Sequence, residues 1–128
     1  MTRIICIGNL FAYPDDFGMA VYEELKKVDL DSSIEVVEGG VGGLSLFPYF
    51  EDDAKILIVD YGSKEIGKIL TKIDVDKIEI DGYDHANALL YLLKSVDKEY
   101  KIYLCSEEYD RSNLSKYVKE ILDMAKGL

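Results

Sequence analysis

Basic residues are scarce in this sequence. There are 15 Lys and Arg residues against 25 Asp and Glu residues, which gives a formal net charge of −10 at pH 7. Because proteins bind phosphate groups through clustered lysines and arginines, this balance argues against nucleic acid and anionic membranes as partners. It favours a basic partner or a cation.

Long apolar runs and cysteines are also few. The first apolar run, residues 4–7, is too short for a signal peptide or a membrane span, and we expect a soluble, cytoplasmic protein. The two cysteines, Cys6 and Cys105, both fall in expected strands. Buried, inert thiols are the usual case at such positions, and no disulfide is expected.

The remaining sequence alternates between strand and helix patterns. With 128 residues, 48% of them apolar, it suits a single domain spanning residues 1–128. The pattern predicts an α/β fold: a three-layer αβα sandwich with a five-stranded, mostly parallel, twisted sheet and helices on both faces. Strands are expected at residues 4–7, 34–37, 56–59, 77–80 and 101–105, and helices at residues 17–28, 44–50, 63–70, 84–93 and 112–124.

One strand differs from the others. Residues 77–80 alternate polar and apolar side chains, which is typical of a half-exposed strand at a sheet edge, where an antiparallel direction is allowed. Ser63 is expected to cap the helix that ends near residue 70, and Asp84 the helix that follows the edge strand.

Three places carry residues suited to chemistry. Asp15 and Asp16 follow the first strand, Asp60 ends the third, and His85, the only histidine, opens a helix. Ligands of α/β sheets collect outside the carboxyl ends of the strands, and two carboxylates with an imidazole suit nickel, zinc or iron. Taken singly, the same residues have structural interpretations: Asp16 as a helix cap, Asp60 in a turn, and His85 as a polar residue of a first helical turn.

Four short motifs carry a resemblance to a known family. They are residues 7–10 (Ile-Gly-Asn-Leu), 38–43 (Glu-Gly-Gly-Val-Gly-Gly), 57–60 (Leu-Ile-Val-Asp) and 83–85 (Tyr-Asp-His). In this order and spacing, the chain resembles the nickel-iron hydrogenase maturation endopeptidases. The resemblance implies a metal-dependent endopeptidase that removes a C-terminal extension from the nickel-loaded large-subunit precursor of a hydrogenase.

The resemblance also assigns site residues. Asp15, Asp60 and His85 fall on the family's metal ligands, and a shift by one residue would make Asp16 the first of them. The nickel is expected to be carried by the substrate, with no intrinsic cofactor, and no conventional nucleophile is expected. Six residues are expected to bind substrate, because a backbone with few Cβ atoms allows close approach: Gly8, Asn9, Gly39, Gly40, Gly42 and Gly43.

Departures from the family pattern leave an alternative. Pro14 stands where the first acid of the acidic pair usually lies, and Val41 replaces a threonine of the glycine loop. A non-catalytic relative that binds only metal or a partner protein is therefore the second interpretation. A flavodoxin-like nucleotide binder is disfavoured, because carboxylates in the first loop would repel phosphate.

Overall fold

The computed structural model describes residues 1–8, 16–40, 42–63, 68–79, 88–106 and 109–128 of the chain. Its strands and helices alternate along the sequence, as the hydrophobic pattern predicts. In chain order they are β1 (Thr2–Cys6), α1 (Phe17–Lys26), β2 (Ile34–Glu38), the 3₁₀ helix η1 (Leu44–Phe50), β3 (Lys55–Ser63), β4 (Lys68–Thr71), α2 (Lys72–Asp76), α3 (Ala88–Ser95), β5 (Tyr100–Ser106), the 3₁₀ helix η3 (Arg111–Asn113) and α4 (Leu114–Lys126).

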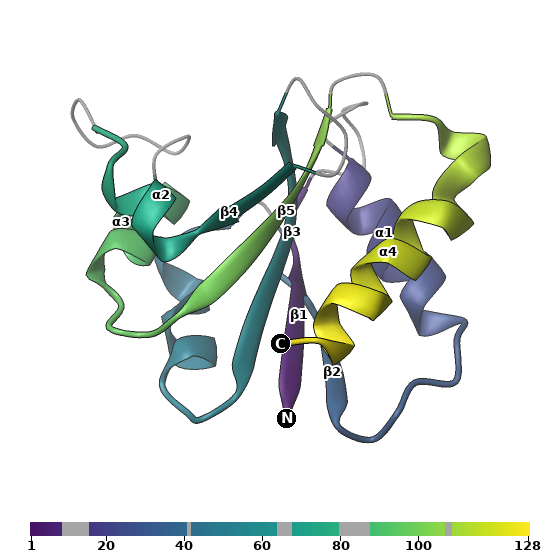
Figure 1. The fold of residues 1–128 in the computed structure, drawn as a ribbon, viewed down its shortest axis with the longest axis horizontal. Helices are drawn as coiled ribbons and strands as arrows, with labels where there is room; N and C mark the ends of the chain where they lie inside the picture. Colours follow the sequence, from purple (N-terminus) through teal and green to yellow (C-terminus); the bar gives the residue numbers. More distant parts are fainter. Residues whose placement is uncertain (9–15, 41, 64–67, 80–87, 107–108) are drawn as a thin grey trace.

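The strands form one five-stranded sheet in the order β2-β1-β3-β5-β4. Strands β2, β1, β3 and β5 run parallel to one another, and β4 pairs antiparallel with β5 at the edge. The predicted fold class, a mostly parallel sheet with one antiparallel edge strand, is confirmed. All parallel strands point their carboxyl ends toward the same rim of the sheet (Figure 1).

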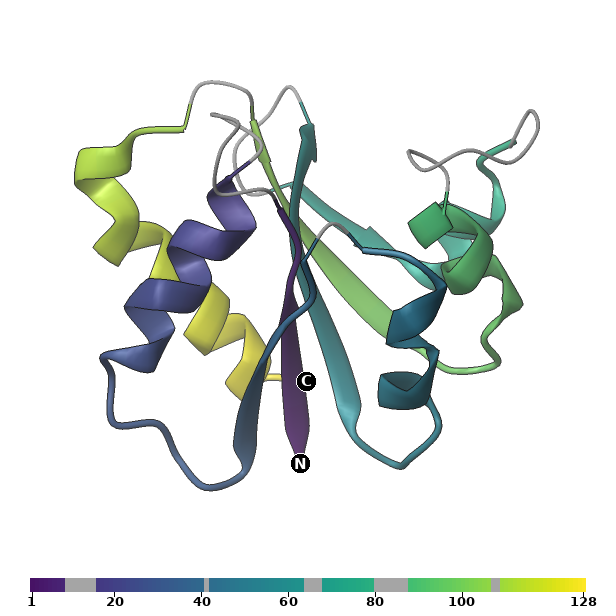
Figure 2. The same cartoon turned by 180° about the vertical axis from the view of Figure 1, so that it is seen from behind.

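Helices cover both faces of this sheet. Helices α1 and α4 pack on one face, and η1, α2 and α3 lie on the other (Figures 1 and 2). Side chains of β1 and of the residue after it alternate between these layers. Ile4 and Cys6 belong to the core beneath α1 and α4, whereas Ile5 and Ile7 belong to the core beneath η1 and α3. A central strand buried on both faces therefore has a continuous apolar sequence.

Helix α1 begins in very close contact with the end of β1. A Cβ atom built on Gly18 would lie 1.8 Å from the carbonyl oxygen of Ile7, a distance that no side chain can adopt. Gly18 thus allows the first turn of α1 to touch the backbone that leaves β1. This contact fixes the entry of the helix at the carboxyl end of the sheet.

Two predicted elements are wrong. The helix expected to reach residue 70 is absent from residues 68–70, which belong to β4, and Ser63 is the last residue of β3 rather than a helix cap. Residues 77–79 are not a strand, because Lys77 and Ile78 form the turn that ends α2. The antiparallel edge strand exists, but β4 forms it. Ile69 and Leu70 of β4 pair with Tyr103 and Ile102 of β5, and local periodicity cannot predict such pairing between distant segments.

Other expectations agree with the structure. The structure has helices at residues 17–26, 44–50, 88–95 and 114–126, which overlap the predicted helices at 17–28, 44–50, 84–93 and 112–124. The cap expected at Asp84 lies outside the described residues. Cys6 and Cys105 are buried and unbridged, and burial raises the pKa of the Cys6 thiol to about 12. Among the described residues, no helix is long and apolar enough to cross a membrane.

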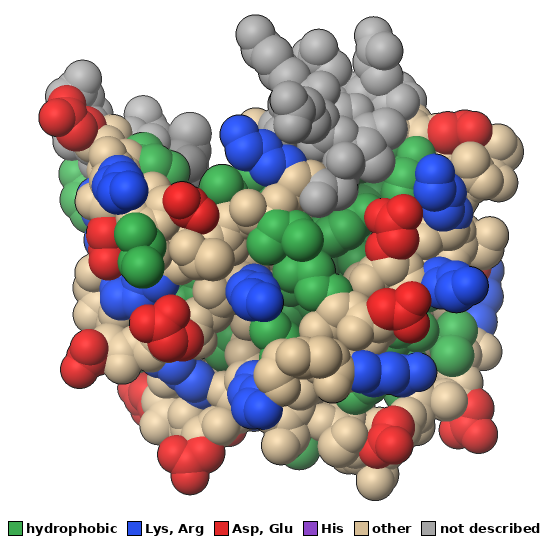
Figure 3. Space-filling model, in the orientation of Figure 1, with side chains coloured by type: hydrophobic (Ala, Val, Ile, Leu, Met, Phe, Trp, Pro, Cys, Tyr) green, Lys and Arg blue, Asp and Glu red, His purple; other side chains and the backbone are tan. Residues whose placement is uncertain are grey.

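The surface carries charges of both signs. On the face drawn in Figure 3, acidic and basic side chains are distributed around an apolar area near the centre. Ile69 of the edge strand β4 is among the large apolar side chains that remain exposed, at 48%. Because strands alternate their faces, the next residue, Leu70, points to the opposite side of the sheet.

Candidate functional site

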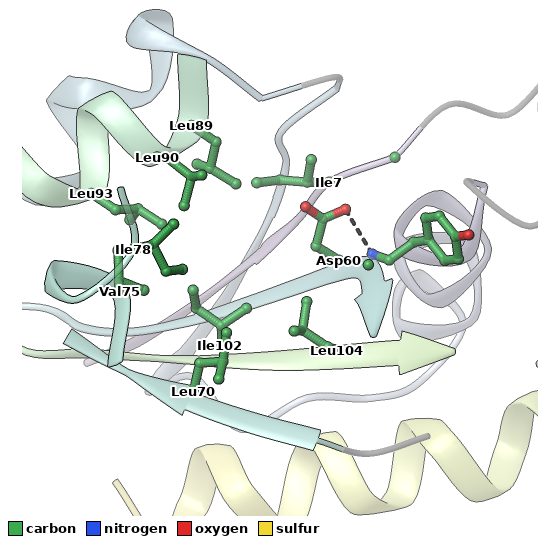
Figure 4. A pocket seen from close by; sticks show the side chains of 13 residues that line it. Ile7, Asp60, Leu70, Val75, Ile78, Leu89, Leu90, Leu93, Ile102 and Leu104 are labelled. Atoms are coloured by element: carbon green, nitrogen blue, oxygen red, sulfur yellow. Dashed lines mark hydrogen bonds between the residues drawn. The ribbon is translucent and has the colours of Figure 1, made fainter. Parts of the chain in front are cut away.

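Asp60 lies at the carboxyl end of the sheet, as predicted. It belongs to β3 and pairs with Leu104 of β5, and its side chain is half-buried. Alternation along β3 places it on the same face as Ile58, beneath α2 and α3. Its Oδ1 accepts the backbone hydrogen of Tyr61 at 2.7 Å, and the carboxylate lies beside Ile7 (Figure 4). This carboxylate therefore borders the space between the sheet and α3.

The glycine segment (Gly39, Gly40, Gly42 and Gly43) folds back against β1. The amide of Gly39 donates to the carbonyl oxygen of Cys6 at 2.7 Å, and the amide of Gly8 donates to that of Gly40 at 2.7 Å. Gly8 and Gly39 thus use their amides within the fold. They hold the glycine segment at the same end of the sheet as Asp60.

Left-handed backbone explains the remaining glycines of this segment. Gly40, Gly42 and Gly43 have φ values of 59°, 79° and 135°, a region that side chains other than hydrogen rarely allow. A Cβ on Gly39 would come within 3.1 Å of the Cys6 oxygen, whereas one on Gly40 would have nothing within 4 Å. Within this segment, therefore, Gly39 serves internal packing, and Gly40 is open to an approaching chain.

Asp16 is buried and directed toward the connection between β5 and α4. Its Oδ1 accepts the hydroxyl hydrogen of Tyr109 at 2.6 Å, and its Oδ2 accepts a hydrogen bond from Arg111. Asp16 does occupy the N-cap position of α1, but its side chain makes no capping hydrogen bond. The expectation of a side-chain cap is therefore wrong: the carboxylate instead joins α1 to the segment before α4.

Sequence reasoning did not single out Tyr109 and Arg111. One signal was available, because the chain contains only two arginines, Arg3 and Arg111, among 25 acidic residues. A buried carboxylate requires strong donors, and arginine supplies them best. The hydrogen bonds of Tyr109 and Arg111 with Asp16 join residues more than 90 positions apart, a contact that only the tertiary fold creates.

Two of the three expected metal ligands, Asp15 and His85, lie outside the described residues, as does Asn9. The convergence of Asp15, Asp60 and His85 on one cation thus stays a prediction. Within the described part of the chain, no group of three or more His, Cys, Asp or Glu side chains is arranged to hold a metal ion.

An apolar pocket of about 530 Å³ opens beside Asp60. Figure 4 shows aliphatic side chains from several elements pointing into it, with the Asp60 carboxylate at its border. Its walls come from the end of β1, from β3, β4 and β5, and from α2 and α3. The described residues that line it are Ile7, Gly8, Asp60, Tyr61, Gly62, Leu70, Val75, Ile78, Leu89, Leu90, Leu93, Ile102 and Leu104.

No pattern of residues along the chain predicted this pocket. Leu70 and Ile78, two of its lining residues, fall in the segments whose secondary structure was predicted wrongly. Only with β4 beside β5 and α2 above them do these side chains face Leu89 and Leu90 of α3.

Comparisons of the sequence identify related proteins. The sequence profile of the family described as HycI, hydrogenase maturation protease, matches residues 19–126. A Methanocaldococcus jannaschii protein with the provisional name hydrogenase maturation protease is 33% identical over 78 residues, which are 59% of this chain and 51% of that protein. The chain thus spans about half the length of this curated relative in the match.

Solved structures share the fold. The hydrogenase maturating endopeptidase HybD from E. coli has a TM-score of 0.75 at 16% identity, over 99% of this chain and 93% of that one. The [NiFe] hydrogenase maturation protease HycI from Thermococcus kodakarensis has a TM-score of 0.66 at 18% identity, over 98% and 92%. At 16% and 18% sequence identity, these two matches show a shared fold.

Proposed function

Because the chain belongs to the hydrogenase maturation protease family, we propose that it is an endopeptidase that removes a C-terminal extension from the nickel-loaded large-subunit precursor of a nickel-iron hydrogenase. Water adds across one peptide bond in this reaction, so the C–N bond breaks and a carboxylate and an amine form. The nickel belongs to the substrate and is not a resident cofactor.

The observation that carries this proposal is the placement of Asp60. A half-buried carboxylate at the carboxyl end of a parallel strand lies beside the glycine segment and an apolar pocket. In α/β sheets this rim is where ligands bind. We assign to Asp60, with Asp15 and His85, the recognition of the substrate's nickel, since oxygen and imidazole ligands suit such a cation.

Asp15 is the preferred first ligand over Asp16. The two oxygens of Asp16 accept hydrogen bonds from Tyr109 and Arg111 on the α4 side of the sheet. Asp60 lies on the face beneath α3. Moving Asp16 toward Asp60 would break both hydrogen bonds and leave a buried tyrosine hydroxyl without its acceptor, which is costly.

The cysteines are poor candidates for a nucleophile. Cys6 is fully buried, and burial raises the pKa of its thiol to about 12, so the reactive thiolate is not available near neutral pH. Cys105 is buried as well. These positions support a reaction in which the protein positions the precursor and water attacks.

The test is cleavage of a purified large-subunit precursor in its nickel-loaded and nickel-free forms, followed by mass spectrometry. We expect the loaded form alone to lose its extension, and Asp60→Ala and His85→Ala to slow cleavage at least ~100-fold. Asp53→Ala is the matched control, because Asp53 is an exposed acid remote from this rim.

Two outcomes would contradict the proposal. Unchanged cleavage by Asp60→Ala or His85→Ala would remove that residue from substrate recognition. Nickel-dependent binding of the precursor without any cleavage would instead assign the chain to the alternative function, a non-catalytic relative that binds the metal-bearing partner.

A further inference from the structure

The pocket beside Asp60 has the chemistry of a side-chain subsite. Its described walls are mostly aliphatic, with Tyr61 the one aromatic residue and Asp60 the one charged residue among them. Among the described lining residues, a phosphate or carboxylate ligand would meet the negative charge of Asp60 and no lysine or arginine. An uncharged, apolar group fits these walls, because burying it removes apolar surface from water on both sides.

The pocket walls come from elements that are far apart in the sequence. Leu70 comes from β4, Leu104 from β5, and Leu89 and Leu90 from α3. All four are half-buried, so each still exposes part of its surface to the pocket. A volume of about 530 Å³ lies in the range of pockets that bind small ligands and exceeds a packing defect.

The pocket is continuous with the proposed catalytic rim. Asp60 borders it, and the Cβ position of Gly42 lies 3.6 Å from the Cβ of Leu89, so the glycine segment adjoins its α3 wall. Gly8, whose amide donates to the Gly40 carbonyl oxygen, also lines the pocket, so a polypeptide that runs from Gly40 toward Asp60 would pass along the edge of the pocket. A peptide also carries backbone N–H groups next to its side chains, and these can donate hydrogen bonds to the Asp60 carboxylate.

We infer that this pocket binds one apolar side chain of the precursor, of leucine, methionine or phenylalanine size, in the segment next to the cleaved bond. The inference rests on the proposed function and adds a substrate preference to it: nickel recognition selects the loaded precursor, and the pocket selects the sequence near the cleavage point. The occupant is a polypeptide substrate rather than a free metabolite, because the glycine segment and Asp60 adjoin the same opening.

The test uses three capped tripeptides, acetyl-Gly-Xaa-Gly-amide with leucine, alanine or aspartate in the middle. Binding is followed by the methyl NMR signals of Leu89, Leu90 and Leu104 up to the solubility limit of each peptide. We expect the leucine peptide to shift these signals, the alanine peptide to bind about 10-fold more weakly, and the aspartate peptide not to bind. Equal shifts for leucine and alanine, or none for leucine, would overturn the subsite.

Neighbouring residues of β4 supply matched variants. Leu70→Ala removes a wall of the pocket, whereas Ile69→Ala truncates an exposed side chain on the opposite face of the same strand. Leu70→Ala should weaken the leucine peptide about fivefold, and Ile69→Ala should leave it unchanged. Leu90→Ala, on α3, repeats the test from another wall, with circular dichroism to confirm folding.

The precursor assay separates this inference from the proposed function. If leucine selectivity and its loss in Leu70→Ala are found but no precursor is cleaved, the subsite stands and the enzymatic role fails. If the precursor is cleaved while leucine and alanine peptides bind alike, the enzymatic role stands and the subsite fails.

Discussion

The two ends of the β-sheet use acidic residues in different ways. At the amino end, Arg3 donates from Nε to Glu35 at 2.9 Å and from two guanidinium nitrogens to Asp52 at 3.0 and 2.7 Å. At the carboxyl end, Asp60 accepts a backbone amide and borders an apolar pocket. The acids at the amino end pair with Arg3 inside the fold, whereas we propose that Asp60 meets the substrate.

The Arg3 cluster (Arg3, Glu35 and Asp52) ties three segments together. The Arg3 side chain is only 8% exposed and also donates to the carbonyl oxygen of Tyr49 at 2.6 Å. A planar guanidinium with five donors can satisfy all these acceptors at once, which lysine cannot. Asp52, in the segment that follows η1, therefore has a structural role.

The largest expected loss of stability comes from the carboxyl end, through a backbone contact rather than a charge. Gly18→Ala places a Cβ against the Ile7 carbonyl oxygen, so α1 must move, and we expect the free energy of unfolding to fall by about 3 kcal/mol or more. Urea denaturation measures this. Gly127→Ala, at φ −89° with ordinary contacts, is the control and should be nearly neutral.

Arg3→Met should produce the next largest effect. It keeps much of the apolar stem but removes every donor of the cluster, and we expect a loss of about 2–3 kcal/mol in unfolding free energy. Lys27→Met removes an exposed pair with Glu24 and should change stability by less than about 0.5 kcal/mol. Similar losses in the two variants would mean that the amino end does not depend on Arg3.

Asp16→Asn tests whether a carboxylate at the carboxyl end can also be structural. The amide loses the charged bond with Arg111 but keeps an oxygen for Tyr109, so we expect a loss of about 1–2 kcal/mol. Asp16→Ala, which removes both acceptor oxygens, Tyr109→Phe and the double variant complete a thermodynamic cycle. Strictly additive losses would show that Asp16 and Tyr109 are not energetically coupled.

Acid should weaken the Arg3 cluster. The Arg3 guanidinium, helped by the Ala54 amide, holds the pKa of Asp52 well below its usual value. Because the folded-state pKa is the lower one, its contribution to stability is present above the unfolded pKa, near about 3.9, and is lost as the pH falls below it. The stability difference between wild type and Asp52→Asn should therefore be constant above about pH 5 and shrink as the pH falls from about 4 toward about 2. A difference that grows toward low pH would contradict this assignment.

The smallest expected change in stability is that of Asp60→Asn. The amide oxygen can still accept the Tyr61 hydrogen, so this contact is kept, and we expect the unfolding free energy to fall by less than in Asp16→Asn. The same variant should process the nickel-loaded precursor poorly. A large loss of stability would place Asp60 with the structural acids and remove the contrast between the two ends.

Much of the fold was predictable. Continuous apolar strands at residues 4–7 and 56–59 predicted central parallel strands, and the amphipathic pattern after residue 112 predicted α4. The four motifs predicted the family, which the profile match confirms. The prediction failed at residues 68–70 and 77–79, next to the short elements β4 and α2, because pairing of β4 with β5 outweighs local periodicity.

The candidate site was predictable only in part. Asp60 lies near the carboxyl end of β3, as expected, but the strand continues to Ser63, because pairing with β5 extends it beyond the apolar run. The role of Asp16 was misjudged, since helix-cap chemistry is local and its actual partners come from beyond β5. Nothing in the sequence separates an acid paired with arginine, such as Asp52, from one that borders a pocket.

The order of residues alone determined the alternation of strands and helices, the buried cysteines and the family motifs, because each depends on neighbours within a few positions along the chain. Tertiary structure alone decided which strand closes the edge of the sheet, which acids are neutralised, and where leucines from separate elements leave an apolar opening. Those features depend on contacts between residues tens of positions apart, and such contacts exist only once the sheet has formed and its helices have packed against it.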